Sequence, residues 1–226
     1  MAPSQNDVFT TPQWARDAVW YQVMVERFRD GEASNNPDPM RPWKSEWYTT
    51  SPWEGADGQT FYKYFVFDRH YGGDLQGLQK KLPYLKDLGI NALYLNPVFQ
   101  AETHHKYDTT DYRHIDASFG AGGNDYSETI QGEDLLDPST WTWSKSDLIF
   151  LEFLKEAKSQ GFKVIIDGVF NHVGTAHPAF VDVKTRGAES PYADWFAIRS
   201  WTPFDYDGWA GFKELPAIMF NFHSIG

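Results

Sequence analysis

The sequence lacks several features that would assign a protein to a class at once. It contains no cysteine, which excludes disulfides, thiolate metal sites and a cysteine nucleophile. No run approaches the roughly 18 apolar residues of a membrane span. Residues 1–13 lack the basic start and the apolar core of a signal peptide, so the sequence predicts no leader there. Localisation stays open, because a secreted or periplasmic protein can have lost its leader.

Positive charge is also scarce. Twenty Lys and Arg stand against 31 Asp and Glu, which gives a formal net charge of −11. Such a balance disfavours nucleic acid and anionic membranes as partners, and a neutral or cationic partner fits better. The chain has 226 residues, of which 41% are hydrophobic and 17% aromatic. It can therefore bury a sizeable core, and its aromatic side chains suit core packing or platforms that stack on sugar rings.

Three apolar segments alternate with two helical ones. We predict strands at Trp20–Phe28, Ile90–Pro97 and Lys163–Phe170. The first helix begins at Asp74, is interrupted by Pro83 and ends at Gly89. Its apolar face consists of Leu75, Leu78, Leu82, Leu85 and Leu88. The second helix has Ser146 as N-cap and ends at Gly161. Its apolar face includes Ile149, Phe150, Phe153, Leu154 and Ala157.

The order strand, helix, strand, helix, strand predicts an α/β protein with adjacent parallel strands and helices outside. A doubly wound sheet and the first part of an eight-fold barrel both fit that order. The long loops after the first two strands, 29–73 and 99–145, favour the barrel, because barrels build their sites from such loops. Gly72-Gly73-Asp74 lies far beyond the first strand and lacks a third glycine, which disfavours a dinucleotide fold.

Polar residues gather where the third strand ends. The segment from Val164 to Gly174 reads VIIDGVFNHVG, so an apolar β-branched run stops at Asp167 and is followed by Asn171 and His172. The carboxyl ends of barrel strands are where active sites lie. The alternative is a buried strand capped by an Asx turn, with His172 as a structural histidine.

The octapeptide IIDGVFNH resembles the first signature region of the α-amylase family, glycoside hydrolase family 13. Four further stretches resemble the family in the family's order. They are VWYQ with RFRDG within 19–31, GGDLQGL at 72–78, LGINALYLNPVF at 88–99, and HKYDTTDY at 105–112 with Ile115 and Asp116. The neopullulanase and cyclomaltodextrinase-like branch is the most similar. The resemblance implies the N-terminal portion of a (β/α)8 TIM barrel, strands one to three, over residues 1–173. It also implies part of the domain B insertion over 174–226, with a divergent C-terminal tail from Ala217.

The resemblance also implies roles for individual residues. Tyr107 would offer its ring to the glucose unit beside the bond that is cut, with His105 in the same substrate-binding loop. Asp108 and His172 would bind sugar hydroxyls, which suits groups that accept and donate hydrogen bonds. Asp167 would structure the site and is not expected to be the nucleophile. Asn171 matches a calcium-binding position, although a structural Asx turn explains it nearly as well.

Retaining glycoside hydrolysis needs a nucleophile and an acid/base. In the family these are an aspartate in a Gly-x-Arg-x-Asp context on the fourth strand and a glutamate on the fifth, and neither context occurs in this sequence. We therefore expect an α-glucan hydrolase or transglycosylase, acting on α-glucan or maltooligosaccharide, whose chain here lacks catalytic residues and is inactive alone. Two alternatives stay open: a non-catalytic glucan-binding remnant, and a partner that completes a barrel with a second chain or by self-association.

Overall fold

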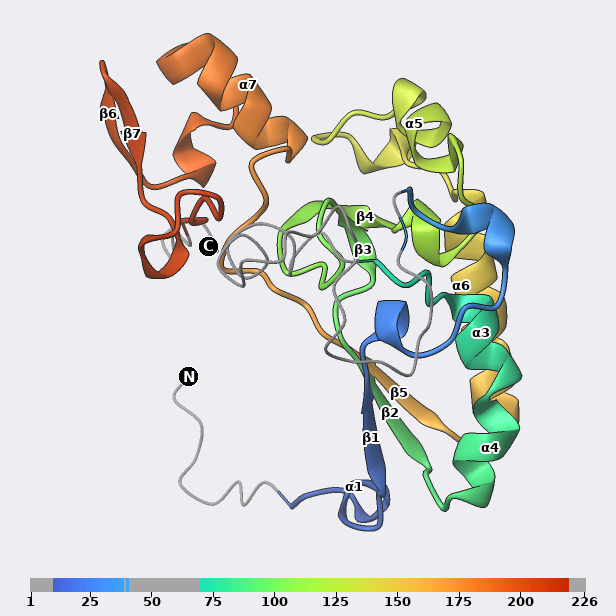
Figure 1. Ribbon diagram of the computed structural model, residues 1–226. Coiled ribbons are helices and arrows are strands. Elements are labelled where there is room, and N and C mark those ends of the chain that lie inside the picture. Colours follow the sequence, from blue (N-terminus) through green and yellow to red (C-terminus); the bar gives the residue numbers. More distant parts are fainter. Residues whose placement is uncertain (1–9, 39, 41–69, 220–226) are drawn as a thin grey trace, which may run out of the picture.

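The computed structural model of this chain describes residues 10–38, 40 and 70–219 (Figure 1). At its centre lies a parallel sheet in the order β1–β2–β5. Its strands are β1 (Trp20–Val23), β2 (Ala92–Leu95) and β5 (Lys163–Ile166). Leu95 pairs with Val23 on one side and with Ile166 on the other. The α/β class and the parallel pairing of the three predicted strands are therefore confirmed.

Each of the three strands is shorter than predicted. After β1 the chain enters a 3-10 turn at Val25–Arg27, because Glu26 turns inward instead of continuing the strand. The Glu26 carboxylate is 1% exposed and accepts hydrogen bonds from the backbone amides of Tyr71 and Gly72. Burial raises the pKa of Glu26, and these donors and Arg27 oppose that rise. The end of β1 is thereby fixed to the segment that leads into the first helix.

Helices cover one face of this sheet (Figure 1). They are α3 (Leu75–Lys80), α4 (Leu82–Asp87) and α6 (Lys145–Ser159). Asp74 caps α3 by accepting a 2.6 Å hydrogen bond from the amide of Gly77. Pro83 lies in the first turn of α4, where its missing N–H is not needed. Gly89, with φ +86, follows the C-cap of α4 and stops the helix, as predicted.

Two details of the helix predictions are wrong. Leu88 is 56% exposed, because it is the C-cap residue after the end of α4 and no longer lies on the face that buries Leu82 and Leu85. The N-cap of α6 is Ser144 and not Ser146. The hydroxyl of Ser144 accepts from Asp147 N at 3.0 Å while the Asp147 carboxylate accepts from Ser144 N at 2.9 Å, a capping box. Ser146 instead donates its hydroxyl to Asp125.

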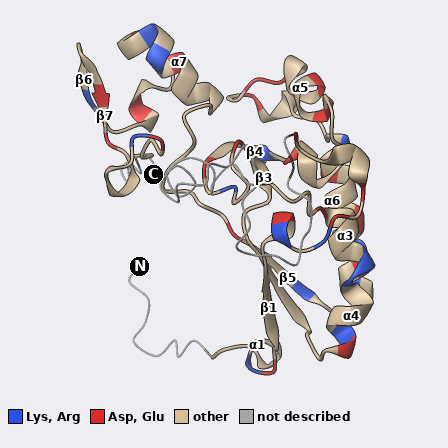
Figure 2. Ribbon diagram, in the orientation of Figure 1, with Lys and Arg blue, Asp and Glu red and all other residues tan. Residues whose placement is uncertain are grey.

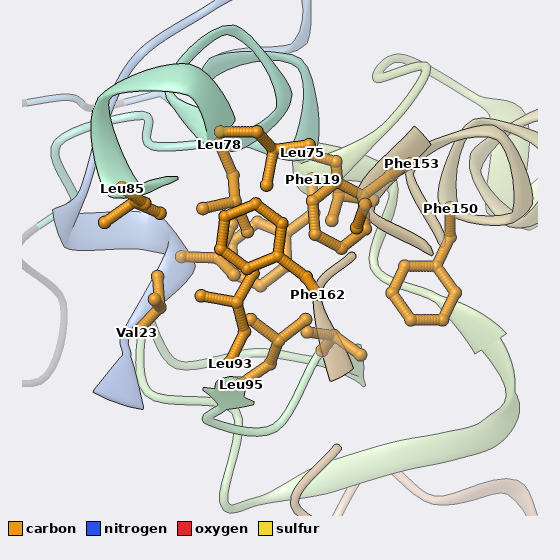
Figure 3. Close-up of a cluster of buried hydrophobic side chains, with 14 of the residues drawn as sticks. Val23, Leu75, Leu78, Leu85, Leu93, Leu95, Phe119, Phe150, Phe153 and Phe162 are labelled. Atoms are coloured by element: carbon orange, nitrogen blue, oxygen red, sulfur yellow. The ribbon is translucent and has the colours of Figure 1, made fainter. Parts of the chain in front are cut away.

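The core lies between the helices and the sheet (Figure 3). Its side chains come from all three helices and all three strands, and ten of them are labelled: Val23, Leu75, Leu78, Leu85, Leu93, Leu95, Phe119, Phe150, Phe153 and Phe162. Strand residues of the other parity point away from the helices, and Trp20 and Ile165 on that face are each 40% exposed. In Figure 2, β1 and β2 carry no charged residue, as expected for strands of a parallel sheet.

The long connections contain structure of their own. Between β2 and α6 the chain forms an antiparallel hairpin, β3 (Phe99–Ala101) with β4 (Thr109–Ile115), and then α5 (Asp125–Thr129). After β5 come α7 (Pro178–Arg186) and the hairpin β6 (Ile198–Trp201) with β7 (Phe204–Tyr206). A short α1 (Gln13–Arg16) precedes β1. Residues 1–9, 39, 41–69 and 220–226 lie outside the described part, and with them most of loop 29–73 and the end of the predicted tail.

The elements after β5 form a second apolar cluster. Phe180 of α7 contacts the rings of Phe196, Phe204 and Tyr206, with centroids 4.8 to 6.3 Å apart. In Figure 1 α7, β6 and β7 lie together, apart from the sheet and its helices. The predicted domain boundary at residue 173 stays a prediction. No helix in the described residues is long and apolar enough to cross a membrane.

Candidate functional site

Side chains from two distant segments meet at the carboxyl end of β5. The hydroxyl of Tyr107, in the turn of the β3–β4 hairpin, donates a 2.9 Å hydrogen bond to Asp167, the first residue after β5. The backbone carbonyl of Tyr107 lies 2.9 Å from His172 Nε2. The Asn171 amide nitrogen lies 2.6 Å from His172 Nδ1. Four of the predicted site residues therefore contact one another.

These contacts define the protonation of His172. A carbonyl can only accept, so Nε2 carries the proton, and Nδ1 is free to accept from the Asn171 amide. Burial lowers the pKa of His172, against the contact with the Tyr107 carbonyl and the charge of Asp108. His172 is 3% exposed. The ring is therefore a neutral imidazole near pH 7, able to donate at one nitrogen and to accept at the other.

Asp108 and His105 belong to the same turn as Tyr107. The Asp108 carboxylate is buried and accepts from the backbone amide of Thr103 at 3.2 Å and from the Thr103 hydroxyl. His105 Nδ1 accepts from the Tyr107 amide at 3.0 Å, and the two rings are 5.7 Å apart. Burial lowers the pKa of His105, while the charge of Asp108 raises it. The structure thus places both residues beside Tyr107, with Asp108 directed toward its own turn.

A second phenol that sequence reasoning missed, that of Tyr94 on β2, lies near Asp167. The neighbouring Asp167 carboxylate raises the pKa of Tyr94. Burial and the bond to Asp167 raise the pKa of Tyr107 to about 12. Both phenols therefore stay protonated donors around neutral pH. The available signal was strand parity, because Tyr94 lies between the core residues Leu93 and Leu95 and so points to the opposite face.

A buried ion pair, Lys106 with Asp116, stabilises the turn that carries Tyr107. Lys106 has φ 62, unusual for a residue with a side chain. Its ammonium lies 2.7 Å from the Asp116 carboxylate, and the two side chains are 3% and 4% exposed. The same Asp116 oxygen accepts from the amide of Ala101. This pair ties the turn to both ends of the β3–β4 hairpin, and sequence reasoning assigned it no role.

The predicted calcium position, Asn171, is exposed and its amide contacts His172. Within residues 10–38, 40 and 70–219, no group of three or more His, Cys, Asp or Glu is placed to hold a metal. A cavity of about 640 Å³ lies elsewhere, between residues 35–38, the hairpin and the segment 116–118. Two of its lining residues carry buried carboxamide oxygens, Asn35 Oδ1 and Asn36 Oδ1, that have no hydrogen-bond partner among the described residues.

Comparison with known proteins places this geometry in a family. Residues 22–131 and 146–221 match the family described as alpha amylase, catalytic domain. The chain belongs to the alpha-amylase family. Among its alpha-amylase relatives, the intracellular maltogenic amylase of Bacillus subtilis (strain 168) is 35% identical over 95% of this chain. Neopullulanase 2 of Thermoactinomyces vulgaris is 39% identical over 86% of it. The resemblance predicted from the sequence is therefore confirmed.

Solved structures of similar sequence agree with the described fold. The cyclic alpha-maltosyl-(1→6)-maltose hydrolase of Arthrobacter globiformis, in complex with maltose, has a TM-score of 0.70 at 31% identity and covers 94% of this chain. A cyclomaltodextrinase has a TM-score of 0.67 at 34% identity. The chain spans 30% and 26% of the two relatives named above, and 40% and 30% of these two structures.

Proposed function

We propose that this chain forms the sugar-holding part of an α-glucan-active glycoside hydrolase, and that its three parallel strands belong to a (β/α)8 barrel. The observation that carries this proposal is the contact of Tyr107 with Asp167 and His172. It joins an aromatic ring, a carboxylate and a neutral imidazole at the carboxyl end of a parallel sheet. The names of the relatives, among them maltogenic amylase and cyclomaltodextrinase, support an α-glucan as the substrate class.

Each residue has a task that follows from its contacts. The half-buried ring of Tyr107 offers an apolar face to a glucosyl unit, and its bond to Asp167 fixes the orientation of the ring. On sugar binding, a hydroxyl replaces the Asn171 amide as donor to His172 Nδ1. That exchange costs little because the Asn171 side chain is exposed. The pre-formed contacts lower the cost of ordering the site when the sugar binds.

We expect no hydrolysis by the isolated chain. A retaining reaction needs a nucleophile and an acid/base about 5 to 5.5 Å apart. The two carboxylates of the cluster are already engaged, Asp108 by Thr103 and Asp167 by Tyr107. We propose that the 226-residue chain binds α-glucan without cleaving it, as expected when both family contexts for the catalytic carboxylates are missing.

Two measurements on the purified chain test this function. In calorimetric titration, maltohexaose is expected to bind the chain and to lose measurable affinity for Tyr107→Ala. In a reducing-sugar assay on starch and cyclodextrin, the chain is expected to match a mock preparation. Saccharide release that disappears in Asp167→Ala would contradict the catalytic part of the proposal. Absence of any maltooligosaccharide binding would contradict the substrate class.

A second candidate function rests on the open face of the sheet. Trp20 and Ile165 are each 40% exposed on the face opposite the helices, so a second chain or a second copy could cover them. Sedimentation over a hundredfold range of concentration tests this role. A monomer at every concentration would contradict self-association. A glucan-dependent gain of mass would support assembly.

Calcium is proposed at a different place from the predicted Asn171. Oxygen ligands suit this ion, and Asn35 Oδ1 and Asn36 Oδ1 are buried with no donor in the part of the chain that the structure describes. The amide of Asn35 contacts the Asp74 carboxylate at 3.3 Å and that of Asn36 contacts Asp30 at 3.0 Å. Calcium is therefore expected to raise the melting temperature, with the increase lost in Asn35→Ala and kept in Asn171→Ala. The reverse pattern would restore the Asn171 assignment.

A further inference from the structure

A segment between α5 and α6, residues 133–142, is anchored at both ends by one buried carboxylate. That of Glu133 accepts from the backbone amide of Thr142 at 2.7 Å and from the Thr142 hydroxyl at 3.2 Å. The same carboxylate lies 2.8 Å from the Arg113 guanidinium and 2.9 Å from the His114 ring, and the Glu133 side chain is fully buried. Arg113 and His114 belong to β4. Both ends of the segment are therefore fixed to β4.

Between its ends the segment is held by its own hydrogen bonds. Asp134 N donates to the Thr140 hydroxyl at 2.8 Å, and the Trp141 indole donates to Asp134 O at 2.7 Å. The side chain of Asp137 caps the 3-10 turn Pro138–Thr140. A segment that is closed in this way presents its side chains in fixed positions.

One of these side chains, that of Leu135, reaches the second apolar cluster. Leu135 is half-buried and packs against the cluster that forms around Phe180 of α7. The next residue, Leu136, is 54% exposed. Segment 133–142 thus joins β4 to the elements that follow β5, and Leu135 makes the apolar part of that connection.

The second apolar cluster holds His172 from both sides. Val173 belongs to the cluster and is 1% exposed, and its amide donates to Pro216 O at 3.1 Å. Ile218 also packs against the cluster, and its amide donates to Asn171 O at 3.0 Å. The residues before and after His172 are therefore fixed by the same cluster that Leu135 contacts.

We propose that segment 133–142 is a brace and that Leu135 is its positioning residue, which holds His172 against the Tyr107 turn through the second apolar cluster. The match to the alpha-amylase catalytic domain leaves out residues 132–145. The brace is therefore a support for His172 that the matched part of the chain does not supply. The effect on sugar binding rests on the proposed function, and the effect on the His172 ring does not.

Calorimetric titration of the whole 226-residue chain with maltohexaose tests the effect on binding. Leu135→Ala is expected to weaken binding about fivefold, within the range for packing changes that act on a neighbouring site. Leu135→Met keeps the volume of the side chain and should keep the affinity. Leu136→Ala is the matched control, because an exposed leucine of the same segment should change binding less than about twofold.

The His172 ring gives a second readout in the absence of sugar. Its Nε2 proton is buried and lies in the 2.9 Å contact with the Tyr107 carbonyl. It should therefore exchange slowly with water and give a proton NMR signal, which is assigned by its absence in His172→Gln. Leu135→Ala should broaden or remove this signal, whereas Leu135→Met and Leu136→Ala should keep it. An unchanged signal in Leu135→Ala would overturn the proposal.

The two readouts separate failure of the brace from failure of the proposed function. If the parent binds no maltohexaose but the His172 signal responds to Leu135→Ala, the proposed function is wrong and the brace stands. If the parent binds and Tyr107→Ala abolishes binding, but Leu135→Ala binds as the parent does, the brace is wrong and the proposed function stands.

Discussion

The hydroxyl of Tyr107 and the carboxylate of Asp167 are joined by a 2.9 Å hydrogen bond between residues 60 positions apart in the chain. One residue lies in the turn of the β3–β4 hairpin and the other directly follows β5. The bond fixes the orientation of the Tyr107 ring, because Asp167 is attached to the end of a sheet strand. The ring is therefore oriented before any ligand arrives.

Removal of the Tyr107 hydroxyl should have a smaller effect than removal of its ring. Tyr107→Phe keeps the aromatic face and loses one hydrogen bond, typically about 1 kcal/mol, so maltohexaose affinity should fall roughly fivefold. Tyr107→Ala should abolish measurable binding. Calorimetric titration compares the two variants. Equal losses in both would mean that the hydroxyl, and not the ring, binds the sugar.

The two segments of the site pack closely, so that a larger residue at Gly174 should disturb the site. Gly174 N donates to Thr109 O at 2.9 Å, and a Cβ on Gly174 would lie 2.4 Å from the Asp108 carbonyl oxygen. Gly174→Ala should push the His172 segment away from the Tyr107 turn and weaken maltohexaose binding at least about tenfold, as one lost aromatic contact would. Gly132→Ala is the control, since nothing lies within 4 Å of its added Cβ. Unchanged binding in Gly174→Ala would show that the two segments can separate without loss.

The buried pair beneath the site should contribute strongly to stability. Lys106→Met leaves the Asp116 carboxylate buried without its cation, which costs about 3 to 5 kcal/mol of unfolding free energy. Urea unfolding measures this loss. Lys155→Met is the control, because Lys155 and Glu152 are 3.9 Å apart with side chains 79% and 70% exposed, and such pairs contribute little. The additional change Asp116→Asn should recover part of the loss, and no recovery would argue against an uncompensated charge.

A buried histidine, His114, should make the free energy of unfolding decrease at alkaline pH. His114 on β4 lies 2.8 Å from the Asp147 carboxylate at the start of α6 and 2.9 Å from that of Glu133. Arg113 also contacts Glu133, and the Tyr126 ring packs against the imidazole. Burial opposes the charge on His114, but the two carboxylates outweigh it and raise the pKa of His114 to about 9.

The sign of the pH effect follows from that pKa. The folded pKa of His114, about 9, exceeds the ordinary value of 6.5, so its stabilisation is complete below pH 6.5 and is lost as pH rises through 9. The shift corresponds to roughly 3 kcal/mol. Urea unfolding between pH 6 and 10 should show this decline in the parent and not in His114→Gln.

His177 provides the control for that measurement. It caps α7 and burial lowers its pKa to about 4. His177→Gln should therefore keep the alkaline decline, since its own contribution changes only as pH falls from 6.5 toward 4. If the slope vanished in both variants, the assignment to His114 would be wrong.

Periodicity predicted the central sheet because it depends on local patterns that tertiary contacts do not alter. The apolar runs around Leu93 and Ile165 identify strands of the sheet, and helix-length separations imply parallel pairing. The meeting of Tyr107 with His172 followed from the resemblance, since both lie after neighbouring strands. Element ends were less predictable. Ser144 and Ser146 flank one lysine, and the capping box of Ser144 with Asp147 decides which serine caps the helix.

Other features depended on contacts between distant residues. Leu88 looked buried because it continues the spacing of Leu82 and Leu85, and that spacing does not show that α4 ends at Asp87. The link of Tyr94 to Asp167 requires knowledge of which strands are neighbours, and the nearness of Trp209 to His172 requires the path of the chain after α7. A sequence pattern carries neither kind of information. The structure therefore adds most at the surface of the site, where loops from different strands meet.

The backbone bonds that join Val173 to Pro216 and Asn171 to Ile218 close the chain between them into a loop with a fixed neck. The entropy of closing such a loop rises only with the logarithm of its length, about 0.6 kcal/mol for each doubling. Residues inserted or removed around β6 and β7 should therefore change the surface of that loop. The two backbone bonds at its neck should still keep His172 in place. This part of the chain can diversify under selection, or be exchanged by graft, without repeated adjustment of the sheet that supports it.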